Sequence, residues 1–141
     1  MIAILLIGFS INAQEITKET GKAIKKGDII TLQKVVKDEN LNDCFEVKGN
    51  LYNYLAISIK VNNLESLKFF VEKGANLENI CRSKTPLMYA VKYGQFEMVK
   101  YLIEKGAKLE TTNTRGKTAL DYAKKYEQME IAVYLEERLN D

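Results

Sequence analysis

Apolar positions return along this chain at the spacing of one helical face, in short runs separated by glycine. The clearest run begins at Thr85-Pro86, where the threonine hydroxyl can accept the first free backbone N–H groups and proline lacks a donor that would be unpaired anyway. Gly94 interrupts the run, the apolar positions then resume, and Gly106 stands at a left-handed helix stop. The pattern predicts a helix–turn–helix unit over 85–109.

The rest of the chain contains copies of this unit. The segment 53–55 aligns with 85–87 at a shift of 32 residues, and TALDYAKKY (118–126) aligns with TPLMYAVKY (85–93) at a shift of 33. A weaker copy begins at Lys22 and aligns with the second unit at a shift of 35. Repeats with a period of about 33 residues indicate a stacked array in which each unit covers the apolar face of its neighbour.

On these residues the chain resembles the ankyrin-repeat family. The family's TPLHxA signature corresponds to TPLMYA (85–90) and TALDYA (118–123), and its glycine between helices corresponds to Gly27 and Gly94, with Glu127 replacing it in the fourth repeat. The resemblance implies an all-α solenoid of about four helix–turn–helix repeats with short hairpin-like loops. The expected repeats are approximately 15–50, 51–82, 83–115 and 116–141.

Eight helices follow from the pattern of apolar positions and caps. They are expected over 15–26, 29–37, 54–61, 64–73, 86–93, 96–105, 119–126 and 129–138. The longest connection, 38–52, contains the turn signal Gly49-Asn50. The connections 76–84 and 108–117 lack the alternation of a strand, so we expect almost no sheet. By the resemblance, these two connections project as hairpin-like fingers.

The amino-acid composition limits the classes of function that this chain can have. The 141 residues include 21 basic and 19 acidic side chains, and the net charge of +2 is far from the strongly basic balance of nucleic-acid-binding proteins. The absence of histidine excludes His-dependent nucleophiles, general bases and metal sites, and no glycine-rich phosphate loop is present. Glu65 and Glu97 fit surface pairs with Lys68 and Lys100, three residues on. We expect neither an enzyme nor a cofactor, metal or nucleic-acid partner.

The first thirteen residues, MIAILLIGFSINA, are uncharged, and they are apolar from Ile2 to Phe9. This segment fits a secretory signal peptide and is too short to span a membrane, although no Lys or Arg precedes its apolar run. The expected organisation is a signal peptide over 1–13 and an ankyrin-repeat domain over 14–141, exported to the periplasm or secreted. The alternative is a further apolar helix packed on the first repeat of a cytoplasmic protein.

The two cysteines, Cys44 and Cys81, fall in the fingers that follow successive repeats. An exported protein meets an oxidising compartment, where a disulfide can persist. Neighbouring fingers lie about one helix diameter apart, ~10 Å, which exceeds the ~4.4–6.8 Å between Cα atoms in a disulfide unless the loop tips lean together. A bridge and two unpaired thiols both remain open.

Four lysines occupy one repeat position: Lys25, Lys60, Lys92 and Lys125 are related by the shifts of 35, 32 and 33 residues. In ankyrin arrays, as the resemblance implies, this position lies late in the inner helix, faces the concave groove and commonly contacts a partner. Neighbouring positions carry mostly tyrosine and aliphatic residues, so we expect a basic, aromatic face with exposed apolar area. The candidate partner-binding residues are Lys25, Ile57, Lys60, Val61, Tyr89, Lys92, Tyr93, Tyr122, Lys125 and Tyr126, together with Arg82 and Arg115.

These observations favour a non-catalytic module that binds a protein partner in its concave groove and at its loop tips. Tyrosine offers large contact area and lysine sets orientation and association rate, so an acidic patch on the partner would fit. The competing interpretation is that lysine, the commonest residue here, simply forms a solvated helix face. The same array also fits a protective or inhibitory partner of an exported enzyme or toxin, or a scaffold in a cell-envelope assembly. We expect a monomer.

Overall fold

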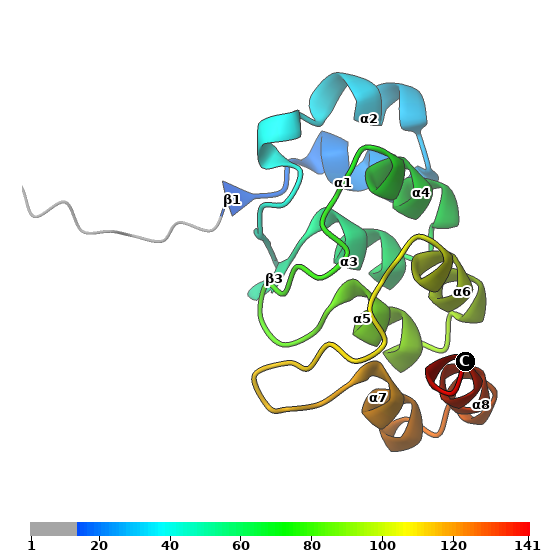
Figure 1. Ribbon diagram of the computed structural model, residues 1–141. Helices are drawn as coiled ribbons and strands as arrows, with labels where there is room; N and C mark the ends of the chain where they lie inside the picture. Colours follow the sequence, from blue (N-terminus) through cyan, green and yellow to red (C-terminus); the bar gives the residue numbers. More distant parts are fainter. Residues whose placement is uncertain (1–13) are drawn as a thin grey trace, which may run out of the picture.

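Four antiparallel helix pairs stack in a row in the computed structural model, which describes residues 14–141 (Figure 1). The inner helices α1, α3, α5 and α7 form one layer, the outer helices α2, α4, α6 and α8 form the second, and the long connections project to one side. This arrangement confirms the all-α repeat solenoid. The helices are α1 (Lys18–Lys26), α2 (Ile29–Val35), α3 (Tyr54–Lys60), α4 (Leu64–Glu72), α5 (Pro86–Lys92), α6 (Phe96–Glu104), α7 (Ala119–Lys125) and α8 (Met129–Leu139), with the 3-10 turn η1 (Asp38–Asn40) after α2.

Side-chain caps fix where the inner helices begin. The Thr85 hydroxyl accepts from the backbone N–H of Met88 at 3.2 Å, and the equivalent Thr118 hydroxyl accepts from Asp121 at the same distance. The predicted first helix, 15–26, is wrong at its start. Thr17 is the N-cap, since its hydroxyl accepts from the Thr20 N–H at 3.1 Å, and α1 therefore begins at Lys18.

A small three-stranded sheet is present, contrary to the expectation of almost none. The 38–52 connection forms a hairpin of β2 (Phe45–Val47) and β3 (Asn50–Tyr52), and β1 (Gln14–Glu15) pairs in parallel with β2. Its turn is Lys48-Gly49, one residue before the predicted turn, and both residues have positive φ (51° and 76°). Two successive positive φ values match the twist of a tight hairpin. The 76–84 and 108–117 connections contain no strand, as predicted.

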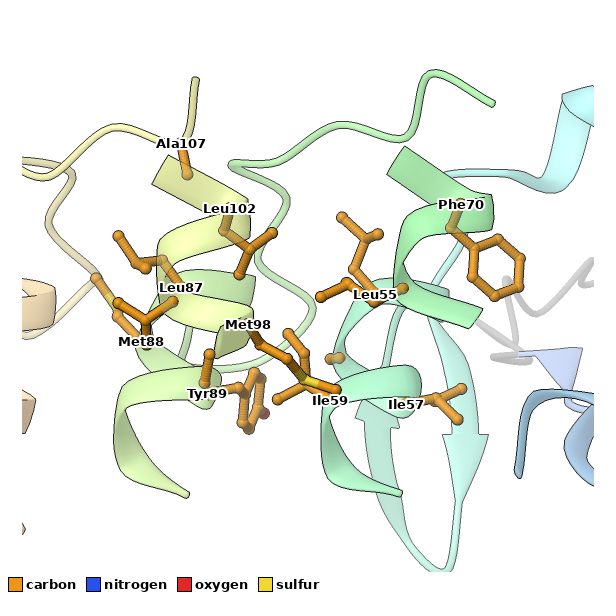
Figure 2. Close-up of a cluster of buried hydrophobic side chains, with 14 of the residues drawn as sticks. Leu55, Ile57, Ile59, Phe70, Leu87, Met88, Tyr89, Met98, Leu102 and Ala107 are labelled. Carbon is orange, nitrogen blue, oxygen red and sulfur yellow. The ribbon is translucent and has the colours of Figure 1, made fainter. Parts of the chain in front are cut away.

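The core is a continuous apolar layer between and within the repeats. Figure 2 shows side chains of α3, α4, α5 and α6 meeting in this layer, including Leu55, Phe70, Leu87 and Leu102. All four are at most 2% exposed. Met88 occupies the position of the family histidine and is fully buried, so a thioether fills space that a polar ring would otherwise take. Each repeat thus depends on its neighbours for burial.

The long connections form three fingers: the first finger (38–52), the second finger (76–84) and the third finger (108–117). A disulfide joins Cys44 in the first finger to Cys81 in the second, with their Cα atoms 5.5 Å apart. The two fingers lean together, which closes the ~10 Å spacing of neighbouring helices. Asn42 holds them there: its Oδ1 accepts from the Asn76 N–H and its carbonyl accepts from Asn79 Nδ2, both at 2.7 Å.

The predicted signal segment, 1–13, lies outside the described residues. Within 14–141, no helix is long and apolar enough to cross a membrane.

Candidate interaction surface

Within the predicted lysine column, contacts between a lysine and a tyrosine ring begin in the second repeat. Lys60 Nζ lies 4.6 Å from the centroid of the Tyr52 ring and donates a hydrogen bond to Tyr52 Oη at 2.9 Å. This hydrogen bond raises the pKa of Lys60 and outweighs the opposing effect of partial burial. The ammonium group is therefore charged and oriented by an aromatic residue at the base of the first finger.

Lys92 connects the third and fourth repeats in the same way. Its Nζ lies 5.4 Å from the ring centroid of Tyr93 and 5.7 Å from that of Tyr126 in the next repeat. Lys125 follows, with its Nζ 5.6 Å from the Tyr126 ring. Three lysines of the column thus alternate with tyrosine rings along one face, at distances typical of cation–π contacts.

The first repeat does not extend this aromatic surface. Lys25 is exposed, and where later repeats carry tyrosine or aliphatic residues its repeat carries Lys22 and Lys26. The backbone carbonyl of Lys25 accepts from Asn63 Nδ2 at 3.2 Å, a contact between repeats that does not involve the amine. The aromatic part of the face therefore runs from the second repeat to the fourth.

The positions next to the lysine column were expected to add exposed apolar area, but three of these residues are buried. Ile57, Tyr89 and Tyr122 are only 6%, 8% and 5% exposed, because successive inner helices pack against one another at this position. Burial raises the pKa of Tyr89 to about 12. Val61 and Tyr93, nearer the open end of the face, are 37% and 38% exposed. The buried side chains form a floor, and the later positions offer the accessible area.

The tyrosines of the floor and the surface are arranged in stacked pairs. Tyr89 and Tyr93 have centroids 6.3 Å apart and rings within 13° of parallel, and Tyr122 and Tyr126 repeat this at 6.1 Å and 8°. Tyr52 extends the row by a tilted contact with Tyr89 at 5.7 Å. The rings hold one another in place, so the surface is formed before any ligand arrives.

Sequence reasoning missed Lys84. Its Nζ lies between two repeats, 5.5 Å from the Tyr89 ring centroid and 5.3 Å from that of Tyr122. Burial lowers the pKa of Lys84, and the positive charges of Lys92, Arg115 and Lys125 lower it further. The repeat register contained the signal: the shifts of 32 and 33 residues that align the inner helices also align 52, 84 and 117, immediately before each helix cap.

The cations of this face have no acidic partner among residues 14–141. The ion pairs of that part of the chain lie elsewhere: Glu65–Lys68, Asp38–Lys73, Glu97–Lys100, Glu136–Lys124 and Asp141–Arg138. The pairs of Glu65 and Glu97 are those predicted from the sequence, on the outer helices. Lys60, Lys84, Lys92 and Lys125 rest on aromatic rings instead, which leaves their positive charge uncompensated.

The two finger arginines differ. Arg82 Nη1 donates to Asn50 Oδ1 at 2.8 Å, so the guanidinium ties the second finger to the β2–β3 hairpin of the first. Arg115 is exposed on the third finger, and only its backbone N–H is held, by Asn113 Oδ1 at 3.0 Å. Arg115 is therefore the finger arginine whose side chain is open to a ligand.

No group of three or more metal-ligating side chains occurs within the described residues, 14–141. The groups with shifted pKa values are the capping carboxylates Asp28 and Asp121, the surface cations Lys100 and Arg138, Lys60, Lys84 and Tyr89 of the inner-helix face, and two tyrosines away from that face, Tyr54 and Tyr101. The surface offers contact area and positive charge.

A search against protein-family models matches this chain to ankyrin repeats (3 copies), over residues 21–113 and 54–140. No curated protein matches the chain. The two matched ranges together run from within α1 to the end of α8.

Proposed function

The chain belongs to the ankyrin-repeat family, whose repeats are generally protein–protein interaction modules, and on that premise we propose that this protein is a non-catalytic module that holds an acidic protein partner against its inner-helix face. One observation carries the proposal. Lys60, Lys84, Lys92 and Lys125 lie on tyrosine rings of one face without an acidic partner among the described residues. A face that is both aromatic and uncompensated in charge favours a ligand with the opposite charge.

The two residue types supply different parts of the binding free energy. Tyr93 and Tyr126 bring rigid contact area with few rotatable bonds, so little conformational entropy is lost when they are covered. The lysines steer the partner during approach and fix its orientation, which raises the association rate more than the affinity. Because the rings hold the ammonium groups in place, part of the ordering cost is already met in the free protein.

We also propose that the protein is exported. The disulfide between Cys44 and Cys81 supports this, because structural disulfides persist in oxidising compartments and are rare in the cytosol. The uncharged apolar segment 1–13 is the proposed signal peptide. Cell fractionation followed by mass spectrometry of the mature N-terminus tests this. An intact protein beginning at Met1 in the cytosolic fraction would contradict it.

Charge reversal tests the binding proposal. The full chain is used to capture the natural partner from the exported fraction, and the affinity is measured for wild type and for Lys60→Glu/Lys92→Glu. We expect a loss of about tenfold or more for the double variant and a weaker dependence of its affinity on salt concentration. The matched control is Lys34→Glu/Lys105→Glu, which makes the same charge change at the ends of the outer helices α2 and α6.

The control separates a local contact from an effect of net charge. If both double variants bind the partner as wild type does, the inner-helix face is not the binding surface. If both weaken binding equally, only the net charge matters, and the proposed surface is again wrong.

A further inference from the structure

A pocket lies at the base of the third finger, at the end of the basic, aromatic face. Its volume is about 210 Å³, and its walls are the side chains of Arg115, Lys117, Asp121, Tyr122 and Lys125. The pocket combines residues of the finger with residues of α7, so it lies where the third finger leads into the inner helix of the last repeat. Its size suits one short side chain of a partner rather than a whole small molecule of drug size.

Lys84 adds a further cation next to this pocket. Its Nζ is 5.3 Å from the centroid of the Tyr122 ring, and its charge interacts with those of Arg115 and Lys125, both of which line the pocket. Partial burial and the like charges lower the pKa of Lys84. An anion between these groups would relieve that repulsion, and it would exchange contacts with water for contacts with fixed cations.

The hydroxyl of Tyr122 can donate a hydrogen bond to a ligand. Asn113 is buried, and its Nδ2 donates to Tyr122 Oη at 3.0 Å and to the Ser83 carbonyl at 2.9 Å. Because the phenol oxygen accepts from the NH2 group of Asn113, which cannot accept a hydrogen bond, the phenol keeps its own hydrogen for a further acceptor. Cations and a neutral O–H donor thus meet at one place.

Asp121, the one acidic residue that lines the pocket, already accepts two hydrogen bonds. Asp121 Oδ2 accepts from the Thr118 N–H at 2.9 Å and from the Thr118 hydroxyl at 3.1 Å, which closes the cap of α7. The hydrogen bond from the Thr118 backbone lowers the pKa of Asp121, so its carboxylate stays charged at the pocket edge. It opposes a doubly charged ligand more than a singly charged one.

We propose that this pocket receives one carboxylate side chain of an acidic segment of the partner, which Lys84, Arg115 and Lys125 hold by charge and Tyr122 holds by its hydroxyl. This inference rests on the proposed function and names the anchor point within it. The carboxylate enters beside the third finger, and the rest of the segment lies along the tyrosines toward Lys60. Glutamate and aspartate are the side chains that meet this description.

Titration with a blocked hexaglutamate peptide tests the anchor. The full chain, labelled with nitrogen-15, is titrated at low ionic strength, and a matched peptide of glutamine and serine is the neutral control. We expect the largest amide shifts within 113–125, and no shifts with the neutral peptide. Lys84→Met should weaken binding about tenfold and Arg115→Gln about threefold, as expected for a partly buried and an exposed charged contact.

The two pocket substitutions are chosen so that they do not disturb the packing of the protein. Lys84→Met keeps an unbranched apolar chain between the rings of Tyr89 and Tyr122, and Arg115 is exposed, so Arg115→Gln tests the same pocket without disturbing packing. Lys34→Gln, which removes a charge from the outer helix α2, should bind the peptide as wild type does.

The outcomes separate this inference from the proposed function. Binding that is unchanged in both pocket variants, or absent in the wild type, overturns the carboxylate pocket. The proposed function then still stands if Lys60→Glu/Lys92→Glu loses the natural partner, because that measurement does not depend on the peptide.

Discussion

The two junctions between fingers are built differently. The first and second fingers are joined covalently through Cys44 and Cys81. The second and third fingers are joined by hydrogen bonds: Glu78 carboxylate oxygens accept from the Lys108 N–H at 3.2 Å and from the Thr111 hydroxyl at 2.7 Å. A disulfide removes conformations from the unfolded chain, whereas each hydrogen bond contributes only about 1 kcal/mol net. The two halves of the array therefore resist opening by different means.

The hydrogen-bonded junction lies on the side of the array where the cations of the proposed pocket gather. A further hydrogen bond of this second junction, from Asn113 Nδ2 to the Ser83 carbonyl, lies beside the pocket, because the same Nδ2 also donates to Tyr122, which lines the pocket where ligand contact is proposed. Hydrogen bonds can exchange for contacts with a partner, but a disulfide cannot.

The turns between the two helices of each repeat also differ. Gly27 and Gly94 have φ values of 67° and 66°, a left-handed conformation that glycine adopts without cost. Asn62 and Glu127 hold φ values of 55° and 56° at the equivalent positions. Asparagine tolerates this conformation, but glutamate does not adopt it readily. The last repeat therefore carries local strain that the first and third repeats avoid.

Removing the disulfide should have the largest effect. The bridged residues are 37 positions apart, so Cys44→Ser/Cys81→Ser should lower the free energy of unfolding by about 3–4 kcal/mol. Urea denaturation of the variant measures this, and wild type under a reducing agent should give the same midpoint. Two titratable thiols in the denatured, unreduced protein would contradict the bridge.

Asn113→Ala should weaken the junction between the second and third fingers, because it removes the hydrogen bond from Asn113 Nδ2 to the Ser83 carbonyl. Asn113 donates to Ser83 and Tyr122 and accepts from the backbone N–H groups of Arg115 and Lys117, so its loss should cost about 2–3 kcal/mol. Thermal denaturation measures the change. The matched control is Asn79→Ala, which lies beside the disulfide and should cost less than about 1 kcal/mol. Equal losses would show that the two junctions do not differ.

Glu127→Gly should give the smallest change in the free energy of unfolding, and it should raise this free energy instead of lowering it. Relief of the left-handed strain should stabilise the protein by about 0.5–1 kcal/mol, net of the entropy that glycine gains in the unfolded chain. Gly94→Ala is the counterpart and should destabilise, since its φ of 66° is strained for alanine and a Cβ there would also displace the end of the Gln128 side chain. Paired denaturation curves measure both. A destabilised Glu127→Gly would show that this turn is unstrained.

Much of the fold could be predicted from the sequence. The apolar spacing and the caps at Thr85 and Thr118 placed six of the helices to within one residue at each end, because these signals act within a single turn of the chain. The start of α1 was missed because the first turn of this polar helix, Lys18 to Gly21, contains no apolar residue that would mark where the helix begins. The β2–β3 hairpin was missed because its strands are three residues each, too short to show alternation.

The candidate surface was only partly predictable. The repeat register identified Lys60, Lys92 and Lys125, since equal positions in stacked units come to lie on one face. It could not say that Ile57 and Tyr122 are buried, because their exposure depends on how closely neighbouring repeats approach. Lys84 lay in the same register, but its place between two rings depends on the path of the finger.

The sequence by itself determined the repeat unit, its helices and the order in which they stack, because these follow from local caps and from apolar periodicity. Only the tertiary structure decided which fingers touch, that Cys44 and Cys81 come within bonding range, and that Lys84 lies beside the pocket of the third finger. The bridged cysteines are 37 positions apart, and Lys84 belongs to the second finger, whereas the residues that line the pocket belong to the third finger and α7. Their distances are set by the packing between repeats, which no single turn of sequence encodes.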